Sequence, residues 1–147
     1  MSGFERKLER INCLIEKLKS ESSSGVLVVV EGEKDARALR AIGIKSEILT
    51  IKSHGRNLTD VVDEISSAGD REIILLMDFD RRGREITERL TKILGGMKVK
   101  LNLNFWREFS SLLNNDLKDV EGLAKYIETL SRKSGKRFSL NPNSEIS

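Results

Sequence analysis

The stretch ILLMDFDRRGREI, residues 74–86, decides the fold because it joins an apolar run directly to two acidic residues. The run that begins at Glu72 and ends at Met77 predicts a strand buried on both faces, as in a parallel sheet. It stops at Asp78 and Asp80, which lie two positions apart. Carboxylates at the end of a buried strand need a partner that holds their charge.

Strands and helices alternate on both sides of this stretch. VLVVVEG, residues 26–32, predicts a second fully buried strand, and Phe4–Leu18 has the spacing of an amphipathic helix. The other expected strands cover residues 46–51 and 97–103, and the other expected helices cover residues 33–44, 58–69, 83–96, 105–113 and 120–133. This alternation predicts an α/β fold with a parallel sheet and helices on both faces.

Acidic residues end two of the expected strands. Glu31 ends the first strand along the chain, and Asp78 and Asp80 follow the third. Sites in parallel sheets lie beyond the carboxyl ends of the strands, where the chain order reverses. If the first and third strands are neighbours, the strand order is 2-1-3-4 and the three carboxylates share one crevice. Their repulsion requires a cation or raised pKa values, and Mg²⁺, with Mn²⁺ as a substitute, is the natural cation for oxygen ligands.

The residues around these acids suit a phosphate group. Glycines let a bulky anion approach the backbone, helix amino-termini present N–H groups, and basic side chains neutralise phosphate charge. The candidate phosphate- and nucleic-acid-binding residues are Gly32, Lys34, Arg56, Arg81, Arg82, Gly83 and Arg84. Simpler roles stay open for some acids. Asp80 could cap a helix, and Glu33 and Asp35 could interact with a helix dipole.

Composition narrows the class of protein. The chain has 147 residues, the length of one ordinary domain, and a net charge of +3. A single cysteine, Cys13, and a single histidine, His54, argue against a disulfide framework and against a structural zinc site. Neither a membrane-spanning apolar run nor a signal-peptide pattern is visible. We therefore expect a cytoplasmic protein that does not act at a membrane.

Two motifs together resemble the Toprim domain. VLVVVEGEKD is followed, one strand and two helices later, by LLMDFDRRG. Glu31 and Gly32 match the family's glutamate and glycine, Asp78 and Asp80 match its Asp-x-Asp pair, and Gly83 matches the glycine that often follows. The resemblance covers roughly residues 26–104. Toprim domains occur in topoisomerases, bacterial-type primases, old-family nucleases and small ribonucleases that mature ribosomal RNA.

The resemblance implies a four-stranded parallel sheet, two aspartates that bind Mg²⁺, and a glutamate that acts as general acid or base on phosphodiester bonds. The nucleophilic tyrosine domain of a topoisomerase, the extra domains of a primase and the P-loop of an old-family nuclease are not found in this sequence. A stand-alone Toprim protein remains, similar to the compact archaeal Toprim proteins and the small Toprim ribonucleases.

The leading hypothesis is therefore a hydrolase, a Mg²⁺-dependent nuclease with Glu31, Asp78 and Asp80 as catalytic and metal-binding residues. By analogy with the small family members, RNA is the expected substrate rather than DNA, with a role in RNA processing that could involve a larger assembly. Two alternatives stay open: a non-catalytic module that binds nucleic acid or a ribonucleoprotein, and a phosphoesterase for small nucleotides.

Three segments are expected along the chain. Residues 1–24 form the amphipathic helix and a Ser-rich connector, residues 25–133 form the Toprim domain with its last helix, and residues 134–147 form a basic, partly flexible tail. The amphipathic helix could pair two copies in a homodimer, although packing on its own sheet is the commoner use of such a stripe.

Overall fold

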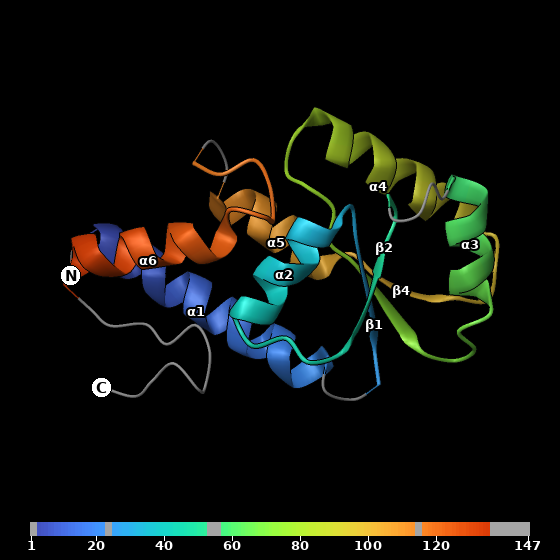
Figure 1. Ribbon diagram of the computed structural model, residues 1–147, viewed down its shortest axis with the longest axis horizontal. Coiled ribbons are helices and arrows are strands. Elements are labelled where there is room, and N and C mark those ends of the chain that lie inside the picture. Colours follow the sequence, from blue (N-terminus) through green and yellow to red (C-terminus); the bar gives the residue numbers. More distant parts are fainter. Residues whose placement is uncertain (1–2, 23–24, 53–56, 114–115, 136–147) are drawn as a thin grey trace.

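A four-stranded parallel sheet forms the centre of the protein (Figure 1). The computed structural model describes residues 3–22, 25–52, 57–113 and 116–135. The strands are β1 (Leu27–Val30), β2 (Glu47–Thr50), β3 (Glu72–Leu75) and β4 (Lys100–Asn102). They lie in the order β2-β1-β3-β4, and all three pairings are parallel. The predicted fold class and strand order are therefore confirmed.

Six helices of the described residues surround this sheet. They are α1 (Gly3–Ser22), α2 (Glu33–Ala41), α3 (Leu58–Ser66), α4 (Arg81–Leu94), α5 (Asn104–Leu113) and α6 (Leu123–Ser134). Helices α3 and α4 cover one face of the sheet, and α1, α2, α5 and α6 cover the other (Figure 1). The molecule is thus a three-layer α/β structure, as the alternating pattern predicts.

Side chains of β1 explain why both faces are covered. Val28 and Val30 point into the cluster under α1, α2, α5 and α6, whereas Leu27 and Val29 point into the cluster under α3 and α4. Successive side chains of a strand point to opposite faces, so an unbroken apolar strand needs an apolar layer on each side. The four β1 residues are at most 3% exposed.

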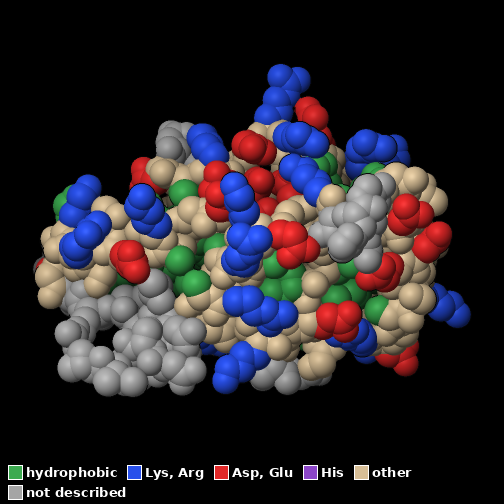
Figure 2. Space-filling model, viewed as in Figure 1, with side chains coloured by type: hydrophobic (Ala, Val, Ile, Leu, Met, Phe, Trp, Pro, Cys, Tyr) green, Lys and Arg blue, Asp and Glu red, His purple; other side chains and the backbone are tan. Residues whose placement is uncertain are grey.

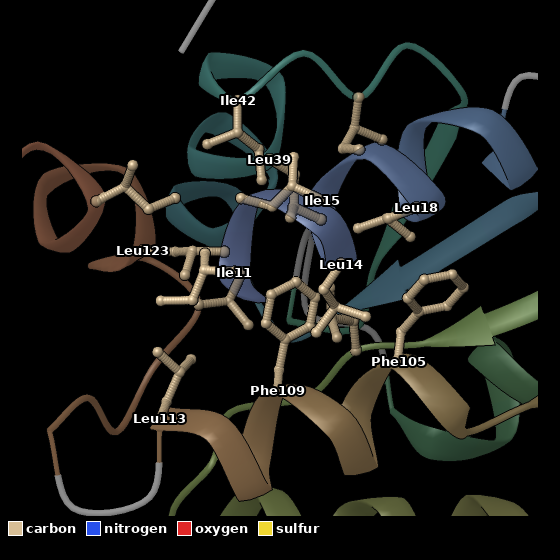
Figure 3. Close-up of a cluster of buried hydrophobic side chains, with 14 of the residues drawn as sticks. Ile11, Leu14, Ile15, Leu18, Leu39, Ile42, Phe105, Phe109, Leu113 and Leu123 are labelled. Atoms are coloured by element: carbon tan, nitrogen blue, oxygen red, sulfur yellow. The ribbon is translucent and has the colours of Figure 1, made fainter. Parts of the chain in front are cut away.

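The predicted N-terminal helix packs on its own chain. Helix α1 is longer than the predicted Phe4–Leu18 segment, and its apolar stripe, including Ile11 and Ile15, lies in the same cluster as Phe109 of α5 and Leu123 of α6 (Figure 3). The stripe thereby covers one face of the sheet. Phe4, at 46% exposed, lies outside this core and contacts the ammonium group of Lys133 at 5.2 Å.

All four strands are shorter than the predicted segments. β3 ends at Leu75, although Leu76 and Met77 are fully buried, and β4 has three residues where the sequence pattern extends over residues 97–103. Beyond Leu75 the chain still lies beside β1, since the Leu76 N–H donates to the Val29 carbonyl at 2.9 Å. The apolar run therefore delivers Asp78 to the carboxyl edge of the sheet.

Candidate functional site

Glu31 occupies the carboxyl end of β1 and is only 2% exposed. Its Oε2 accepts a hydrogen bond from the Asp78 backbone N–H at 2.9 Å. Its Oε1 lies 3.5 Å from the Nζ of Lys52, whose backbone N–H also donates to the Glu31 carbonyl at 2.9 Å. A single buried carboxylate thus joins the ends of β1, β2 and β3, which the strand order brings together.

Hydrogen bonds from distant parts of the chain fix the position of Asp78. Its Oδ1 accepts a hydrogen bond from the Val120 backbone N–H at 3.0 Å, and its carbonyl oxygen accepts one from the Trp106 indole Nε1 at 3.2 Å. Burial, followed by the negative charges of Asp35 and Glu31 and a hydrogen bond with the Glu31 carboxylate, raises the pKa of Asp78 to about 7, against the opposing effect of the Val120 N–H. The charge repulsion that acts on Asp78 thus comes from Asp35 and Glu31.

Gly83 brings the start of α4 against Asp78. A Cβ atom at Gly83 would lie 2.0 Å from the Asp78 carbonyl oxygen, so no larger residue fits without movement of the backbone. Close packing against the Asp78 backbone therefore explains why the Asp-x-Asp-x-x-Gly motif has a glycine at this position. Gly32 differs, since a Cβ there would make only an ordinary contact at 3.9 Å with Asp35.

Asp80 is exposed and caps α4. Its Oδ1 accepts a hydrogen bond from the Gly83 backbone N–H at 2.7 Å, which is the helix-capping role that the sequence left open. Its other carboxylate oxygen is a potential ligand at the same edge of the sheet. Capping also fixes the direction in which the aspartate side chain leaves the backbone.

Asp35 is a site residue that sequence reasoning did not select. The residue is 6% exposed, and its Oδ2 accepts a hydrogen bond from the Gly32 backbone N–H at 3.0 Å, as a capping acid does. It also lies close enough to Asp78 and Glu31 for their charges to interact. Burial is the main cause that raises the pKa of Asp35, with contributions from the charges of Glu31 and Glu121. Burial at a first helical turn is not visible in a sequence, so the dipole interpretation was the natural one.

The segment 116–122, distant in sequence from β1 and β3, also contacts the site. The Lys118 carbonyl accepts a hydrogen bond from the Phe79 N–H at 2.7 Å, Val120 donates to Asp78, and Glu121 lies near Asp35. This contact between distant parts of the chain depends on how α5 and α6 pack, so local sequence patterns could not predict it. Lys52 was also missed, although its position just after β2, beside Glu31, follows from the confirmed strand order.

The predicted phosphate-binding residues surround the carboxylates unevenly. Lys34, Arg82 and Arg84 are exposed on the first turns of α2 and α4, and Arg81 is exposed but pairs with Glu85 at 3.2 Å. Arg56 lies outside the described residues. Figure 2 shows acidic side chains gathered near the top of the molecule, above α2, with Lys and Arg side chains around them.

The donor set suits a divalent cation. Glu31, Asp78 and Asp80 supply carboxylate oxygens, the ligands that such ions prefer, and burial together with the charges of Asp35 and Glu31 raises the pKa of Asp78. One oxygen of each of these carboxylates accepts a backbone N–H. Within the part of the chain that the structure describes, no three Asp, Glu, His or Cys side chains form a preassembled metal-binding cluster. The carboxylates fit a cation by chemistry, and their convergence would require side-chain rotation.

Comparison with known sequences defines the class of protein. The sequence model of the Toprim domain matches residues 26–110, more than half of the chain, so the protein belongs to the Toprim family. Toprim domains generally bind divalent metal ions, and the family points to metal-dependent activity on nucleic acids.

Its relatives are small archaeal proteins. The chain is 29% identical to a UPF0292 protein of Methanosarcina acetivorans, covering 95% of both chains, and 32% identical to a UPF0292 protein of Archaeoglobus fulgidus, covering 80% of this chain and 89% of the relative. Among solved structures, a protein from Aquifex aeolicus aligns with a TM-score of 0.62 and 26% identity, covering 76% of this chain and 95% of that one. These matches confirm the predicted resemblance to compact archaeal Toprim proteins.

None of the helices formed by the described residues is long and apolar enough to cross a membrane.

Proposed function

We propose that the protein is a divalent-metal-dependent nuclease that hydrolyses phosphodiester bonds, with RNA as its preferred substrate and Mg²⁺ as its metal. The observation that carries this proposal is the hydrogen bond that the Asp78 backbone N–H donates to the Glu31 carboxylate at 2.9 Å, which brings two acidic residues at neighbouring strand ends together. A buried and a half-buried acid in such proximity destabilise each other unless a cation binds between them, which is the arrangement that a metal-dependent site needs.

Each carboxylate has a distinct part in this proposal. Asp78 and Asp80 would hold the metal, and Glu31 would either complete the metal shell or hold and move a proton at Oε1. A bound divalent cation would supply positive charge to the scissile phosphate and to its attacking water. Lys52, half-exposed beside Glu31, is placed to neutralise an incoming phosphate.

The basic residues of α2 and α4 extend this site toward a longer substrate. Lys34, Arg82 and Arg84 are exposed on the two helices that begin at the carboxyl edge. Side chains at such positions can bind the phosphates that flank a scissile bond. This arrangement supports a polymer as substrate rather than a single nucleotide.

Three substitutions test the proposal with little risk to the fold. In Glu31→Gln and Asp78→Asn the new side chain keeps an oxygen that can accept the same backbone N–H, and in Asp80→Asn it remains a good helix cap. We expect each variant to lose cleavage of labelled single-stranded RNA by about 100-fold or more in Mg²⁺. Asp63→Asn, an exposed carboxylate on α3, is the matched control and should cleave at the wild-type rate.

The assay compares RNA with DNA of the same sequence, single strands with duplexes, and Mg²⁺ or Mn²⁺ with EDTA. Cleavage that persists in EDTA or in all three variants would overturn the proposal. Faster cleavage of DNA would overturn the preference for RNA alone. Turnover of mononucleotides without cleavage of polymers would instead identify a small-nucleotide phosphoesterase.

A non-catalytic nucleic-acid-binding module is the second candidate. The observation that favours it is that protein groups contact both oxygens of Glu31, the Asp78 N–H on one and the Lys52 ammonium on the other. Such a carboxylate could serve only to hold the strand ends together. Metal-dependent binding of RNA with no product under any of these conditions would support this candidate.

A further inference from the structure

A groove runs along the outer edge of β4, between α4 and α5. Its first part has a volume of about 410 Å³ and its second about 530 Å³, and Thr91, Leu103 and Arg107 line both. In the described residues β4 pairs only with β3, so its other edge faces this groove. Both volumes fall in the range of about 300–1,000 Å³ that is usual for ligand sites.

The groove carries an excess of positive charge. Arg84, Lys92, Lys100 and Arg107 line it, against the two acids Glu72 and Glu88. Glu72 accepts a hydrogen bond from the Asn102 amide at 2.6 Å. No ion pair between described residues involves any of the four basic side chains, and all four are exposed. They are available for an anionic partner.

Helix α4 arranges part of this charge as a track. Arg84, Glu88, Thr91 and Lys92 recur at spacings of three and four residues, which places them on one face of the helix. Lys92 lies eight positions after Arg84, a distance of about 12 Å along the helix axis. The track begins in the first turn of α4, four residues after Asp80.

Trp106 connects the groove to the carboxylates. It is half-buried and lines the first part of the groove, and its indole N–H donates to the Asp78 carbonyl at 3.2 Å. An aromatic wall beside basic residues is the combination that binds unpaired bases, because every base can pack its flat face on an aromatic or apolar surface. Bases in a duplex are already stacked on one another and cannot pack on Trp106 in this way.

We infer that the groove lined by Arg84, Lys92, Trp106 and Arg107 binds a single-stranded segment of nucleic acid that continues from the carboxylate site. This inference deepens the proposed function and rests on it for the placement of the scissile bond, but strand binding in the groove can be measured without cleavage. Flanking phosphates contact the basic side chains, and a base packs against Trp106. The groove thereby selects single-stranded over double-stranded substrates.

The experiment measures binding in the Glu31→Gln background with EDTA, so that no strand is cut. A labelled single-stranded 12-mer of RNA, the same sequence as DNA, and the RNA duplex are titrated by fluorescence anisotropy at several salt concentrations. Intrinsic fluorescence is followed in parallel, because Trp106 is the only tryptophan of the chain and reports directly on the groove. The test variant adds Lys92→Ala and Arg107→Ala, and the matched control adds Arg37→Ala and Lys45→Ala, which remove two charges from exposed positions outside the groove.

We expect the single strands to quench Trp106 saturably and to bind at least about tenfold more tightly than the duplex. The test variant should bind at least about tenfold more weakly, with the slope of log K against log salt reduced by about 1.4, or about 0.7 for each lost phosphate contact. The control should keep the parent slope. Equal affinities for RNA and DNA would support recognition by charge and stacking. Any preference between the two would then arise outside the groove.

The inference is overturned if strands bind without changing Trp106 fluorescence and the test variant keeps the parent affinity, or if no oligonucleotide binds. In the first case the proposed function survives, because nucleic acid would reach the carboxylates by another surface. Conversely, groove binding by a wild-type protein that never cleaves would uphold the inference and refute the nuclease proposal.

Discussion

The helical layer of α1, α5 and α6 and the carboxyl edge of the sheet are built by opposite means. Ile11, Ile15, Phe109 and Leu123 in the layer are completely buried and apolar (Figure 3). At the edge, Glu31 is almost as buried but carries a carboxylate, which the Asp78 N–H and the half-exposed Lys52 offset. Apolar burial stabilises the fold, whereas buried acids cost free energy unless they are compensated. The protein therefore carries a cluster of destabilising carboxylates at one edge of a well-packed apolar core.

The largest effect on stability is expected in the layer. Phe109→Ala would leave a cavity in the cluster of α1, α5 and α6, where the ring centroid of Phe79 lies 6.4 Å from that of Phe109. We expect a loss of about 4 kcal/mol in the free energy of unfolding, measured by urea denaturation. Ile93→Ala, at a position 40% exposed, is the control and should lose less than about 1 kcal/mol. Equal losses in the two variants would contradict the role assigned to the layer.

The next effect is expected where the backbone of α4 contacts the carboxyl edge. Gly83→Ala would place a methyl group 2.0 Å from the Asp78 carbonyl, so α4 or the end of β3 must move. We expect a loss of about 3 kcal/mol in stability, together with a large loss of cleavage, because the shift displaces Asp78. Gly96→Ala is the control, since its added Cβ would meet only the Ile93 carbonyl at 3.8 Å. A fully stable Gly83→Ala protein would show that the close approach is absent in solution.

A smaller change in stability, in this case a gain, is expected from a substitution at the carboxyl edge. The pKa of Asp78 rises from 3.8 to about 7 on folding, so the folded state binds the proton more tightly and stability falls as pH rises from about 4 to about 7. In EDTA, Asp78→Asn should therefore stabilise the protein by about 2 kcal/mol at pH 8 and by nothing at pH 4. Denaturation curves at the two pH values test this. A difference that does not depend on pH would contradict it.

The smallest effect is expected at the outer rim of the layer. Asp116 accepts hydrogen bonds from Lys7 and from the Tyr126 hydroxyl, and these contacts lower the pKa of its carboxyl group. Because the pKa is lowered on folding, this stabilisation is present at neutral pH and disappears as the pH falls through the folded pKa. The side chain is 48% exposed, so Asp116→Asn should cost less than about 1 kcal/mol at pH 7. A cost that persists at pH 2 would contradict the electrostatic explanation.

Sequence patterns predicted the parts of the molecule that depend on local periodicity. The sheet order was predicted from the apolar run before Asp78 and the strand that ends at Glu31. Acids at two strand ends can form one site only if those strands are neighbours. The lengths of β3 and β4 were overestimated, since apolar composition reports burial and not pairing. Leu76 and Met77 are buried without belonging to a strand.

The parts of the site that sequence could not predict depend on packing between distant segments. Asp35 has the pattern of a capping acid, and only the fold reveals that it is buried beside Glu31. Val120 contributes a backbone N–H, which carries no residue-specific signal at all. Trp106 is half-buried and lines a groove, because it lies where both apolar layers meet.

The two backbone amides that donate to carboxylates make the site observable in solution. The Asp78 N–H points at Glu31 and the Val120 N–H points at Asp78, so each amide hydrogen senses the charge of one acid. In a ¹⁵N-labelled sample, the chemical shifts of these two resonances should move with proton loss from Asp78 and again when a divalent ion is added. Two peaks of an ordinary amide spectrum thus give a titration readout of the carboxylate pair, independent of any substrate.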